Sequence, residues 1–348
     1  RNGVLQEQPV LTLFTNVNQD SGLLSIVTDP DFAQNHHFYV WYAPGVGSKG
    51  WRGNTFLRLS RFTLDEESGR ADAGSEHIVL DNVPWANTHN GGGLVFDAQG
   101  DLYIGIGDIR ERDVVQNPRH FEGKVLRIHP TQTGYTVPED NPFRQMDGAR
   151  PEVYALGLRN PFRMARHSDG RIVVGDVGAE DWEEINLVTA GANYGWPERE
   201  GPCITDSSPP CSAAPAKYTA PALYYRHKGG GAVTALAFYE GDRLPADYRG
   251  DLFYADFDQA TVFAADVNGN GFTIEPFVSG LAGVVDLIPV NNGLYYLDLP
   301  NGEVGLIYYA ESAGQTPQAR LAIDNSFGPA PLSVDFSADG SSDPNGLP

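Results

Sequence analysis

The chain has 348 residues, with 40 glycines and 25 prolines but only two methionines, which suits many short strands and turns better than long helices. We therefore expect a large all-β core. Apolar runs such as 103-YIGIG-107 are far shorter than the roughly 18 residues needed to cross a bilayer, which argues against a transmembrane protein. With 45 acidic and 24 basic side chains, the net charge of −21 would repel a phosphate backbone, so we expect no nucleic-acid partner.

Six segments share one pattern, in which a turn leads into a strand rich in aromatic and β-branched residues. In chain order they are 36-HHFYVWYA-43, 97-DAQGDLYIGIGD-108, 167-HSDGRIVVGDVG-178, 247-DYRGDLFYADF-257, 261-TVFAADVNGNG-271 and 291-NNGLYYLDLP-300. One segment per unit gives six units of about 52 residues, the size of a four-stranded propeller blade. The sequence therefore predicts a six-bladed β-propeller over residues 1–312.

His89 and Asp108 are the first candidates for chemistry. His89 stands at the entrance of one expected strand and Asp108 at the end of the next, so both side chains should face one end of the propeller channel. A neutral imidazole there can accept a proton from a hydroxyl group, with a carboxylate orienting the ring. A purely structural histidine is the alternative interpretation.

A crowded acidic segment follows in 175-GDVGAEDWEEIN-186. Its carboxylates belong to Asp176, Glu180, Asp181, Glu183 and Glu184. Carboxylates and turn carbonyls packed this densely favour a hard cation such as Ca²⁺, which takes six to eight oxygen ligands. A solvated acidic loop is the alternative.

The two cysteines, Cys203 and Cys211, lie in the Pro- and Ser-rich stretch 201-GPCITDSSPPCSAAP-215. A short disulfide between them would staple this loop and indicates an oxidising compartment; two reduced thiols are the alternative. Arg1 is not a natural start and no signal peptide is visible. We therefore expect a secreted, periplasmic or cell-surface protein whose beginning has been removed.

The tail changes character at residues 313–318, a polar Gly/Pro linker. The following 319-ARLAIDNSFGPAPLSVDFSADGSSDPNG-346 resembles the opening strands of a PKD-type immunoglobulin-like domain, with its GxAPLxVxF strand and GSSDPxG turn. We expect residues 319–348 to be the first part of such a β-sandwich, which implies association with a cell surface or a polysaccharide.

Several motifs together give the chain a wider resemblance. These are 22-GLLSIVTDPDF-32, the HxGGxL stretch at His89, 123-GKVLRI-128, 156-LGLRNPFR-163, 183-EEINLV-188 and 193-NYGWP-197. Over roughly residues 20–310 the chain resembles the soluble glucose/sorbosone dehydrogenases. These are quinoproteins that bind pyrroloquinoline quinone (PQQ) on a six-bladed propeller, and the resemblance extends to the Hedgehog-interacting-protein branch.

This resemblance implies a role for each matching residue. His89 would be the general base that deprotonates the anomeric hydroxyl of a sugar, with Asp108 supporting it. Arg159 and Asn160 would contact the quinone. The carbonyls of Gly178 and Ala179 would hold a Ca²⁺ that polarises PQQ, and Glu184 and the Tyr194 carbonyl would be ligands of a neighbouring calcium.

The chain departs from the family where PQQ carboxylates are bound. A lysine and an Arg-x-Arg pair of the family are replaced by Asp258, Gly283 and Val285, and no Lys or Arg occurs between Arg249 and Arg320. Two glutamines of the family are replaced by Asp20 and Val177. Loss of three charge-assisted hydrogen bonds would weaken PQQ binding by about 4–9 kcal/mol.

Three functions follow as hypotheses. The first is a secreted, PQQ- and Ca²⁺-dependent dehydrogenase that oxidises an aldose at its anomeric carbon. The second is a non-catalytic, calcium-stabilised propeller that binds a glycan or a protein partner, because the cations for PQQ are missing. The third is another calcium-dependent chemistry, such as that of a lactonase, in which His227 would be a second imidazole on the channel face.

Overall fold

A computed structural model describes residues 8–17, 19–45, 56–205, 213–227, 230–267 and 273–309, together with the backbone of 322–323 and 336–337. The chain divides into two compact units, one of residues 8–227 and the other mainly of residues from 228 onward. The expected all-β class is confirmed, because the helices are four residues long or shorter. Within the described part of the chain, no helix has the length and apolar character needed to span a membrane.

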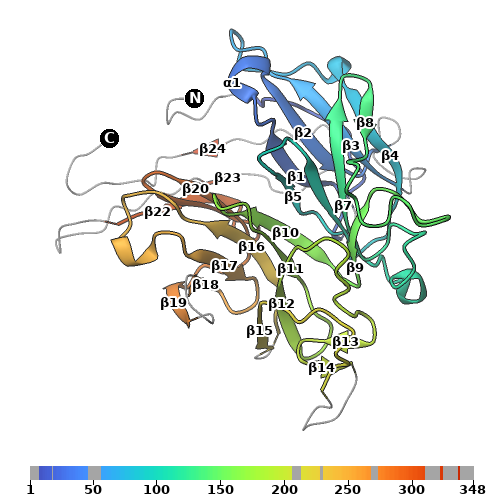
Figure 1. The fold of residues 1–348 in the computed structure, drawn as a ribbon. Coiled ribbons are helices and arrows are strands. Elements are labelled where there is room, and N and C mark those ends of the chain that lie inside the picture. The colour runs from blue at the N-terminus through green and yellow to red at the C-terminus, as the bar shows by residue number, and fades with distance from the viewer. Residues whose placement is uncertain are drawn as a thin grey trace. The chain divides into compact units, whose positions relative to one another are not determined.

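The first unit contains three antiparallel sheets, which we call blades 1 to 3 (Figure 1). Blade 1 consists of β1 (Leu23–Thr28), β2 (His37–Tyr42), β3 (Phe56–Thr63) and β4 (His77–Pro84), with α1 (Phe32–Asn35) between β1 and β2 and the 3₁₀ turn Ala73–Ser75 before β4. Blade 2 consists of β5 (Leu94–Phe96), β6 (Leu102–Ile106), β7 (Lys124–Thr131), β8 (Gly134–Thr136) and β9 (Val153–Leu156), with the 3₁₀ turn Arg112–Val114 between β6 and β7. Both β8 and β9 pair with β7.

Blade 3 completes the first unit with β10 (Pro161–Arg166), β11 (Ile172–Asp176), β12 (Trp182–Leu187) and β15 (Leu223–Arg226). A small hairpin of β13 (Arg199–Glu200) and β14 (Cys203–Ile204) lies between β12 and β15 in the sequence. Strand β10 packs against β5 and β6, so blades 2 and 3 are neighbours. Apolar side chains fill the unit; Trp41, Leu59 and Ile104 are fully buried.

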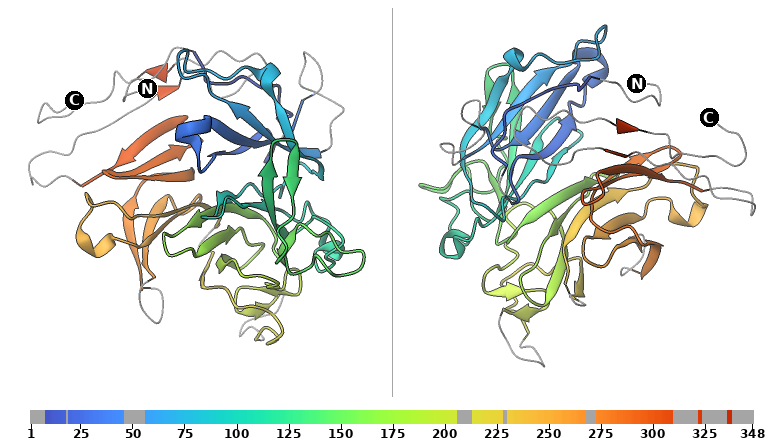
Figure 2. Two further views of the ribbon diagram at one scale, coloured as in Figure 1. Left: turned by 45° about the horizontal axis from the view of Figure 1, so that its top comes forward. Right: turned by 180° about the vertical axis from the view of Figure 1, so that it is seen from behind.

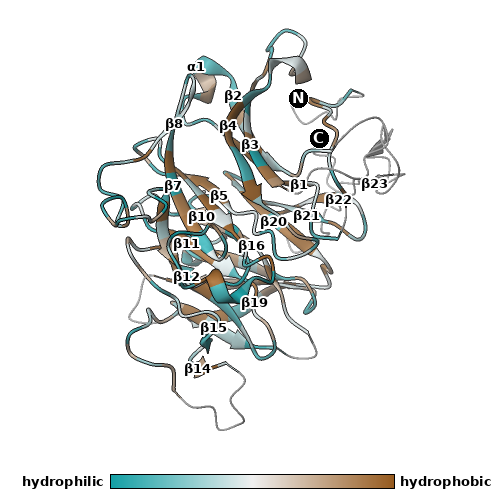
Figure 3. Cartoon of the chain, turned by 90° about the vertical axis from the view of Figure 1, so that its right-hand side faces the viewer, coloured by the Kyte–Doolittle hydropathy of each residue, from teal (hydrophilic) through white to brown (hydrophobic). Residues whose placement is uncertain are grey.

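The second unit contains blades 4 and 5. Blade 4 consists of β16 (Val233–Phe238), β17 (Leu252–Asp256), β18 (Thr261–Asp266) and β19 (Thr273–Ser279), with the 3₁₀ turn Ala246–Tyr248 before β17. Blade 5 consists of β20 (Val284–Val290), β21 (Gly293–Asp298) and β22 (Glu303–Ile307). Figure 2 lets the reader follow the sheets in chain order from blue to orange, and in Figure 3 hydrophobic colour follows many of the strands.

This succession of sheets is that of an all-β β-propeller, but the described residues form five blades, so the prediction of six is wrong for them. The miscount has a simple cause. The sequence predicts the segments at 247–257 and 261–271 to be two units, whereas their strands β17 and β18 pair with each other throughout, from Leu252 with Ala265 to Asp256 with Thr261. They are adjacent strands of one blade.

The predicted PKD-like domain at 319–348 lies mostly outside the described residues. Only β23 (Ala322–Ile323) and β24 (Phe336–Ser337) are described there, and they pair antiparallel. The linker at 313–318 lies outside the described residues altogether. The domain boundaries therefore stay predictions.

Candidate active site

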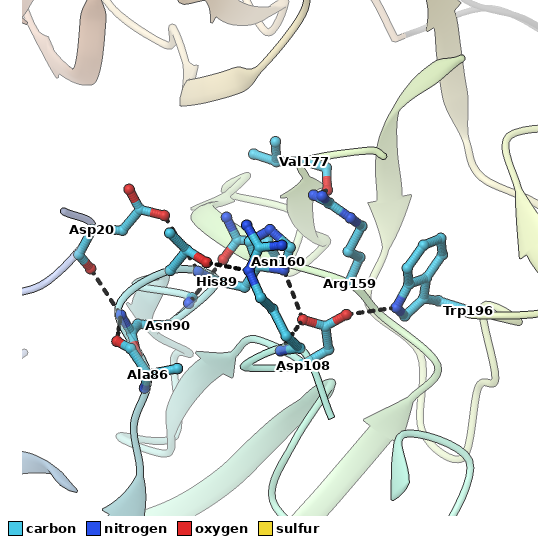
Figure 4. Close-up of polar contacts among 12 residues, drawn as sticks. Asp20, Ala86, His89, Asn90, Asp108, Arg159, Asn160, Val177 and Trp196 are labelled. Atoms are coloured by element: carbon cyan, nitrogen blue, oxygen red, sulfur yellow. Dashed lines mark hydrogen bonds and ion pairs between the residues drawn. The ribbon is translucent and has the colours of Figure 1, made fainter. Parts of the chain in front are cut away.

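His89 and Asp108 meet because of the β5–β6 hairpin. The two strands are antiparallel, with Leu94 opposite Ile104, so the residues before β5 lie beside those after β6. The Nδ1 atom of His89 is 2.8 Å from Oδ1 of Asp108. The side chains are 12% and 1% exposed, respectively, so the pair is largely removed from solvent (Figure 4).

Asp108 is held by two further donors. The backbone N–H of Arg110 donates to Oδ1 at 2.9 Å, and the indole N–H of Trp196 donates to Oδ2 at 2.8 Å. Burial raises the pKa of Asp108, but the hydrogen bonds from His89, Arg110 and Trp196 outweigh burial, so the pKa lies below its usual value. An ionised Asp108 accepts the Nδ1 proton of His89, which leaves Nε2 of the neutral ring as the basic nitrogen. Among the described residues, Nε2 has no hydrogen-bond partner.

The backbone around this pair is in the left-handed region. His89 has a φ of 59°, and Ile109 and Arg110, which directly follow Asp108, have φ values of 45° and 68°. The N–H of Ile109 donates to the carbonyl of His89 at 3.2 Å, which ties the two segments together. A Cβ atom at Gly107 would lie 1.9 Å from that same carbonyl, so only glycine permits this approach.

Arg159 and Asn160 come from the turn between β9 and β10. The N–H of Gly91 donates to Oδ1 of Asn160 at 2.9 Å, so Asn160 anchors the segment that carries His89. The guanidinium of Arg159 donates through Nη1 to the carbonyl of Val177 at 2.9 Å, and its Nε is buried without a partner. The guanidinium carbon also lies 5.6 Å from the ring centre of Trp196.

Asp176, the last residue of β11, binds the backbone of this turn through its carboxylate. Its carboxylate accepts from the N–H of Arg159 at 3.0 Å and from the N–H of Asn160 at 2.6 Å. Burial, reinforced by Glu184, raises the pKa of Asp176 well above its usual value despite these bonds. Burial also lowers the pKa of Arg159, an effect that Asp108 and Asp176 oppose.

The five carboxylates of the acidic segment do not all converge on one point. Glu180 and Asp181 are exposed, whereas Asp176, Glu183 and Glu184 are buried. Glu183 accepts from the N–H of Gly178 at 3.1 Å. Within the described residues, no group of three or more His, Cys, Asp or Glu side chains is arranged to hold a metal ion.

Glu184 is enclosed by donors of its own. The N–H of Gly201 donates to its Oε1, and the amide of Asn186 donates to Oε2 at 3.1 Å. Burial raises the pKa of Glu184 to about 7. Nearby, the backbone N–H groups of residues 179–182 all point to Oε1 of Glu200, at 2.7, 2.9, 3.2 and 3.3 Å.

A small cavity of about 10 Å³ lies next to these acids, close to the space that one water molecule requires. Its lining includes three of the residues predicted to be calcium ligands, Gly178, Glu184 and Tyr194. Asp176 and Glu200 also line it. Ala179, the remaining predicted ligand, is not among the residues that line this cavity, and its N–H donates to Glu200.

Comparison with known proteins identifies the family of this chain. A family model described as Glucose / Sorbosone dehydrogenase matches residues 2–285. The chain belongs to the glucose/sorbosone dehydrogenase family.

Individual members of the family show the likeness in sequence and in fold. "Aldose sugar dehydrogenase YliI" of Escherichia coli is 33% identical over 263 residues, covering 72% of this chain and 66% of that protein. The apo-form crystal structure of the soluble aldose sugar dehydrogenase of E. coli superimposes with a TM-score of 0.67 at 26% identity, covering 92% of this chain and 84% of that one. The PQQ-bound aldose sugar dehydrogenase of Streptomyces coelicolor shares the fold, with a TM-score of 0.64 at 23% identity and coverage of 81% and 75%.

The resemblance to the Hedgehog-interacting branch of this family is confirmed as well. The mouse Hedgehog-interacting protein is 27% identical over 181 residues, which are 47% of this chain and 26% of that protein. The chain therefore spans about two thirds of the E. coli relative and about a quarter of the mouse protein.

The structure brings together four residues that the sequence nominated for the family's chemistry: His89, Asp108, Arg159 and Asn160. Sequence reasoning missed Trp196 and Asp176 as their partners. Trp196 belongs to the NYGWP motif, which indicates the family but does not predict this contact. Asp20, which stands where the family has a glutamine, accepts from the N–H of His89 at 3.3 Å.

Other nominated residues lie elsewhere or have structural partners. His227 Nε2 lies 2.7 Å from Oε1 of the buried Glu183. Cys203 is disulfide-bonded, and Cys211, the only other cysteine of the sequence, lies outside the described residues. In the second unit, Val285 is buried, and Gly283 has a φ of 74°.

Proposed function

We propose that this protein is a secreted or periplasmic sugar dehydrogenase that oxidises an aldose at its anomeric carbon. One observation carries the proposal: a buried, ionised Asp108 holds Nδ1 of His89 at 2.8 Å and leaves Nε2 without a partner in the described residues. That arrangement is what a general base requires.

His89 would accept the proton of the anomeric hydroxyl at Nε2, while Asp108 stabilises the resulting imidazolium. As the C1–O bond becomes a carbonyl, the C1 hydrogen leaves with its electron pair, so the sugar becomes a lactone. When bound, PQQ would supply the acceptor for that hydride. Arg159, which is partly buried near Asp108, would place positive charge next to the acceptor.

The residues present fit the quinone end of PQQ but offer less to its carboxylates. The buried Nε of Arg159 lacks a partner, so a quinone oxygen would satisfy a donor that is otherwise unpaired. At the positions that match the carboxylate-binding cations, Asp258, Gly283 and Val285 provide none. Gly283 also leaves little room for one, because its Cβ would lie 2.3 Å from Pro300 Cδ. We therefore expect PQQ binding that is weak for this family.

We place the calcium ion of this proposal at the small cavity beside Glu184, which Arg159 and Arg199 also line. Its wall includes the carboxylates of Asp176 and Glu184, whose pKa values are both raised by burial, and a cation there would favour their ionised forms. We propose that Glu184, the Tyr194 carbonyl and Gly178 contribute to a Ca²⁺ site. The carbonyl of Ala179 stays part of this proposal through the family resemblance alone.

The deciding experiment measures dye reduction by purified protein supplied with PQQ, Ca²⁺ and a panel of aldoses. His89→Ala should lower kcat by roughly 10²- to 10⁴-fold, the usual contribution of a general base. His129→Ala is a matched control, because Nδ1 of His129 also lies 2.8 Å from a carboxylate of blade 2, that of Asp101, away from the candidate site. Equal rates in wild type and His89→Ala would refute the proposal.

A second function is favoured by the missing cations. A propeller that binds no PQQ could bind a glycan or a protein partner on the same face, with the PKD-like tail attaching it to a cell surface or polysaccharide. If the protein gains no quinone absorbance, reduces no dye and retains a glycan on an array, the binding function replaces the dehydrogenase.

A further inference from the structure

Trp196 contacts two of the candidate active-site side chains, those of Asp108 and Arg159. Its indole N–H donates to Asp108 Oδ2 at 2.8 Å, and the Arg159 guanidinium lies over its ring at 5.6 Å. Figure 4 shows the indole beside Asp108, with the side chain of Arg159 nearby. One buried side chain thus contacts both the support of the proposed base and the cation proposed for the cofactor.

Trp196 is itself fixed from several directions. Its backbone N–H donates to the carbonyl of Gly157 at 2.9 Å, and its backbone carbonyl accepts from the side-chain amide of Gln116 at 2.6 Å. A second guanidinium, that of Arg112, lies over the ring at 4.7 Å. The residue is 3% exposed. Gly157 and Gln116 therefore fix the backbone of Trp196, and Arg112 covers its ring.

The two oxygens of Asp108 are not equivalent. Oδ1 accepts from both His89 and the Arg110 backbone, whereas Oδ2 accepts from the indole N–H of Trp196. Without that N–H, Oδ2 would be buried and unpaired, which is costly for a carboxylate. The carboxylate would then rotate or draw in water, and the direction of Nε2 of His89 would change with it.

We propose that Trp196 is a positioning residue of the active site: its N–H fixes the Asp108 carboxylate that aims His89, and its ring confines Arg159. This inference rests on the proposed dehydrogenase function. Trp196 touches neither the sugar nor the reacting atoms in this role, and it acts through Asp108 and Arg159.

Trp196→Phe separates the two parts of the role, because phenylalanine keeps an aromatic face but lacks the N–H. We expect kcat roughly 10- to 100-fold lower with KM nearly unchanged, as for loss of a hydrogen bond to a charged group. Trp41→Phe is the matched control. Trp41 is fully buried, and its indole N–H has no partner among the described residues, so this change alters packing alone and should leave kcat near the wild-type value.

Proton NMR of the Nδ1–H of His89 gives a readout that packing alone would not move. In wild type a hydrogen-bonded Nδ1–H should give a protected downfield signal, which His89→Ala assigns. In Trp196→Phe the signal should broaden or exchange faster, and in Trp41→Phe it should not. If Trp196→Phe does not fold, Asp108→Asn in labelled protein should shift one of the indole N–H signals.

The outcomes separate this inference from the proposed function. If wild type reduces no dye but the Nδ1–H signal is lost in Trp196→Phe, the dehydrogenase proposal fails while the positioning of His89 by Trp196 holds. An unchanged Nδ1–H signal together with wild-type kcat in Trp196→Phe overturns the inference. Indole signals unaffected by Asp108→Asn would overturn it equally.

Discussion

Lys124 is fully buried at the start of β7, where its ammonium donates to the carbonyls of Val115 and Glu122, both at 2.6 Å. Burial lowers its pKa to about 7, against a smaller opposing effect of Glu122. In the unfolded chain a lysine titrates near pH 10.4. Between about pH 7 and 10 the unfolded state therefore binds a proton that the folded state lacks, and stability should rise with pH across this window.

Urea unfolding of wild type and Lys124→Met at pH 7, 8, 9 and 10 tests this. The free energy of unfolding of wild type minus that of the variant should increase with pH. Lys217→Met provides the control, because the Lys217 side chain is 61% exposed, and its difference from wild type should not rise in this way. Parallel pH profiles for wild type and Lys124→Met would contradict the assignment.

At the scale of residues, the sequence predicts contacts within one hairpin better than contacts between distant segments. His89 and Asp108 could be paired because a single antiparallel turn separates their strands. Trp196 lies 88 positions from Asp108, and no periodic pattern links them. A tryptophan in such a motif is equally consistent with packing in the core, so the hydrogen bond from its indole N–H to Asp108 could not be predicted.

At the scale of elements, the loop between β11 and β12 carries the calcium prediction. Removing Ca²⁺ with EDTA should lower the melting temperature, since an ion at about 100-fold excess over its Kd would stabilise the fold by roughly 2.7 kcal/mol. Glu184→Gln should lose most of this response, because Glu184 lines the cavity. Glu180→Gln, exposed in the same loop, should respond like wild type. A wild-type melting curve that EDTA leaves unchanged would rule out the site.

The same loop shows why charge density alone is a weak guide. The five carboxylates of residues 176–184 would repel one another if all were ionised and none were neutralised by a partner. The fold instead gives the buried ones separate donors, such as the N–H of Asn160 for Asp176 and that of Gly201 for Glu184. Those donors lie in other segments of the chain, so the sequence could not predict these hydrogen bonds.

At the scale of the whole molecule, we expect affinity for PQQ to depend on positive charge that this chain lacks at the positions matching the family's cations. Asp258→Lys should restore one charge-assisted hydrogen bond at the position matching the family's lysine and raise PQQ affinity by roughly 10- to 100-fold. Asp242→Lys makes the same charge change at an exposed side chain of the same unit and should have little effect. Equal PQQ titrations for the two variants would show that position 258 does not serve the cofactor.

The left-handed backbone at the candidate site has a consequence for engineering. Of the seven non-glycine residues with positive φ in the described chain, three are His89, Ile109 and Arg110. A β-branched residue such as Ile109 is strained there by about 1–2 kcal/mol, which glycine would relieve. Selection for heat resistance alone should therefore favour Ile109→Gly, loosen the segment that carries Asp108 and lower turnover. We therefore expect thermostability and catalytic rate to be opposed at this loop. Variants selected for heat resistance alone should have lost turnover, and their loss would show how much the strained backbone contributes to the catalytic rate.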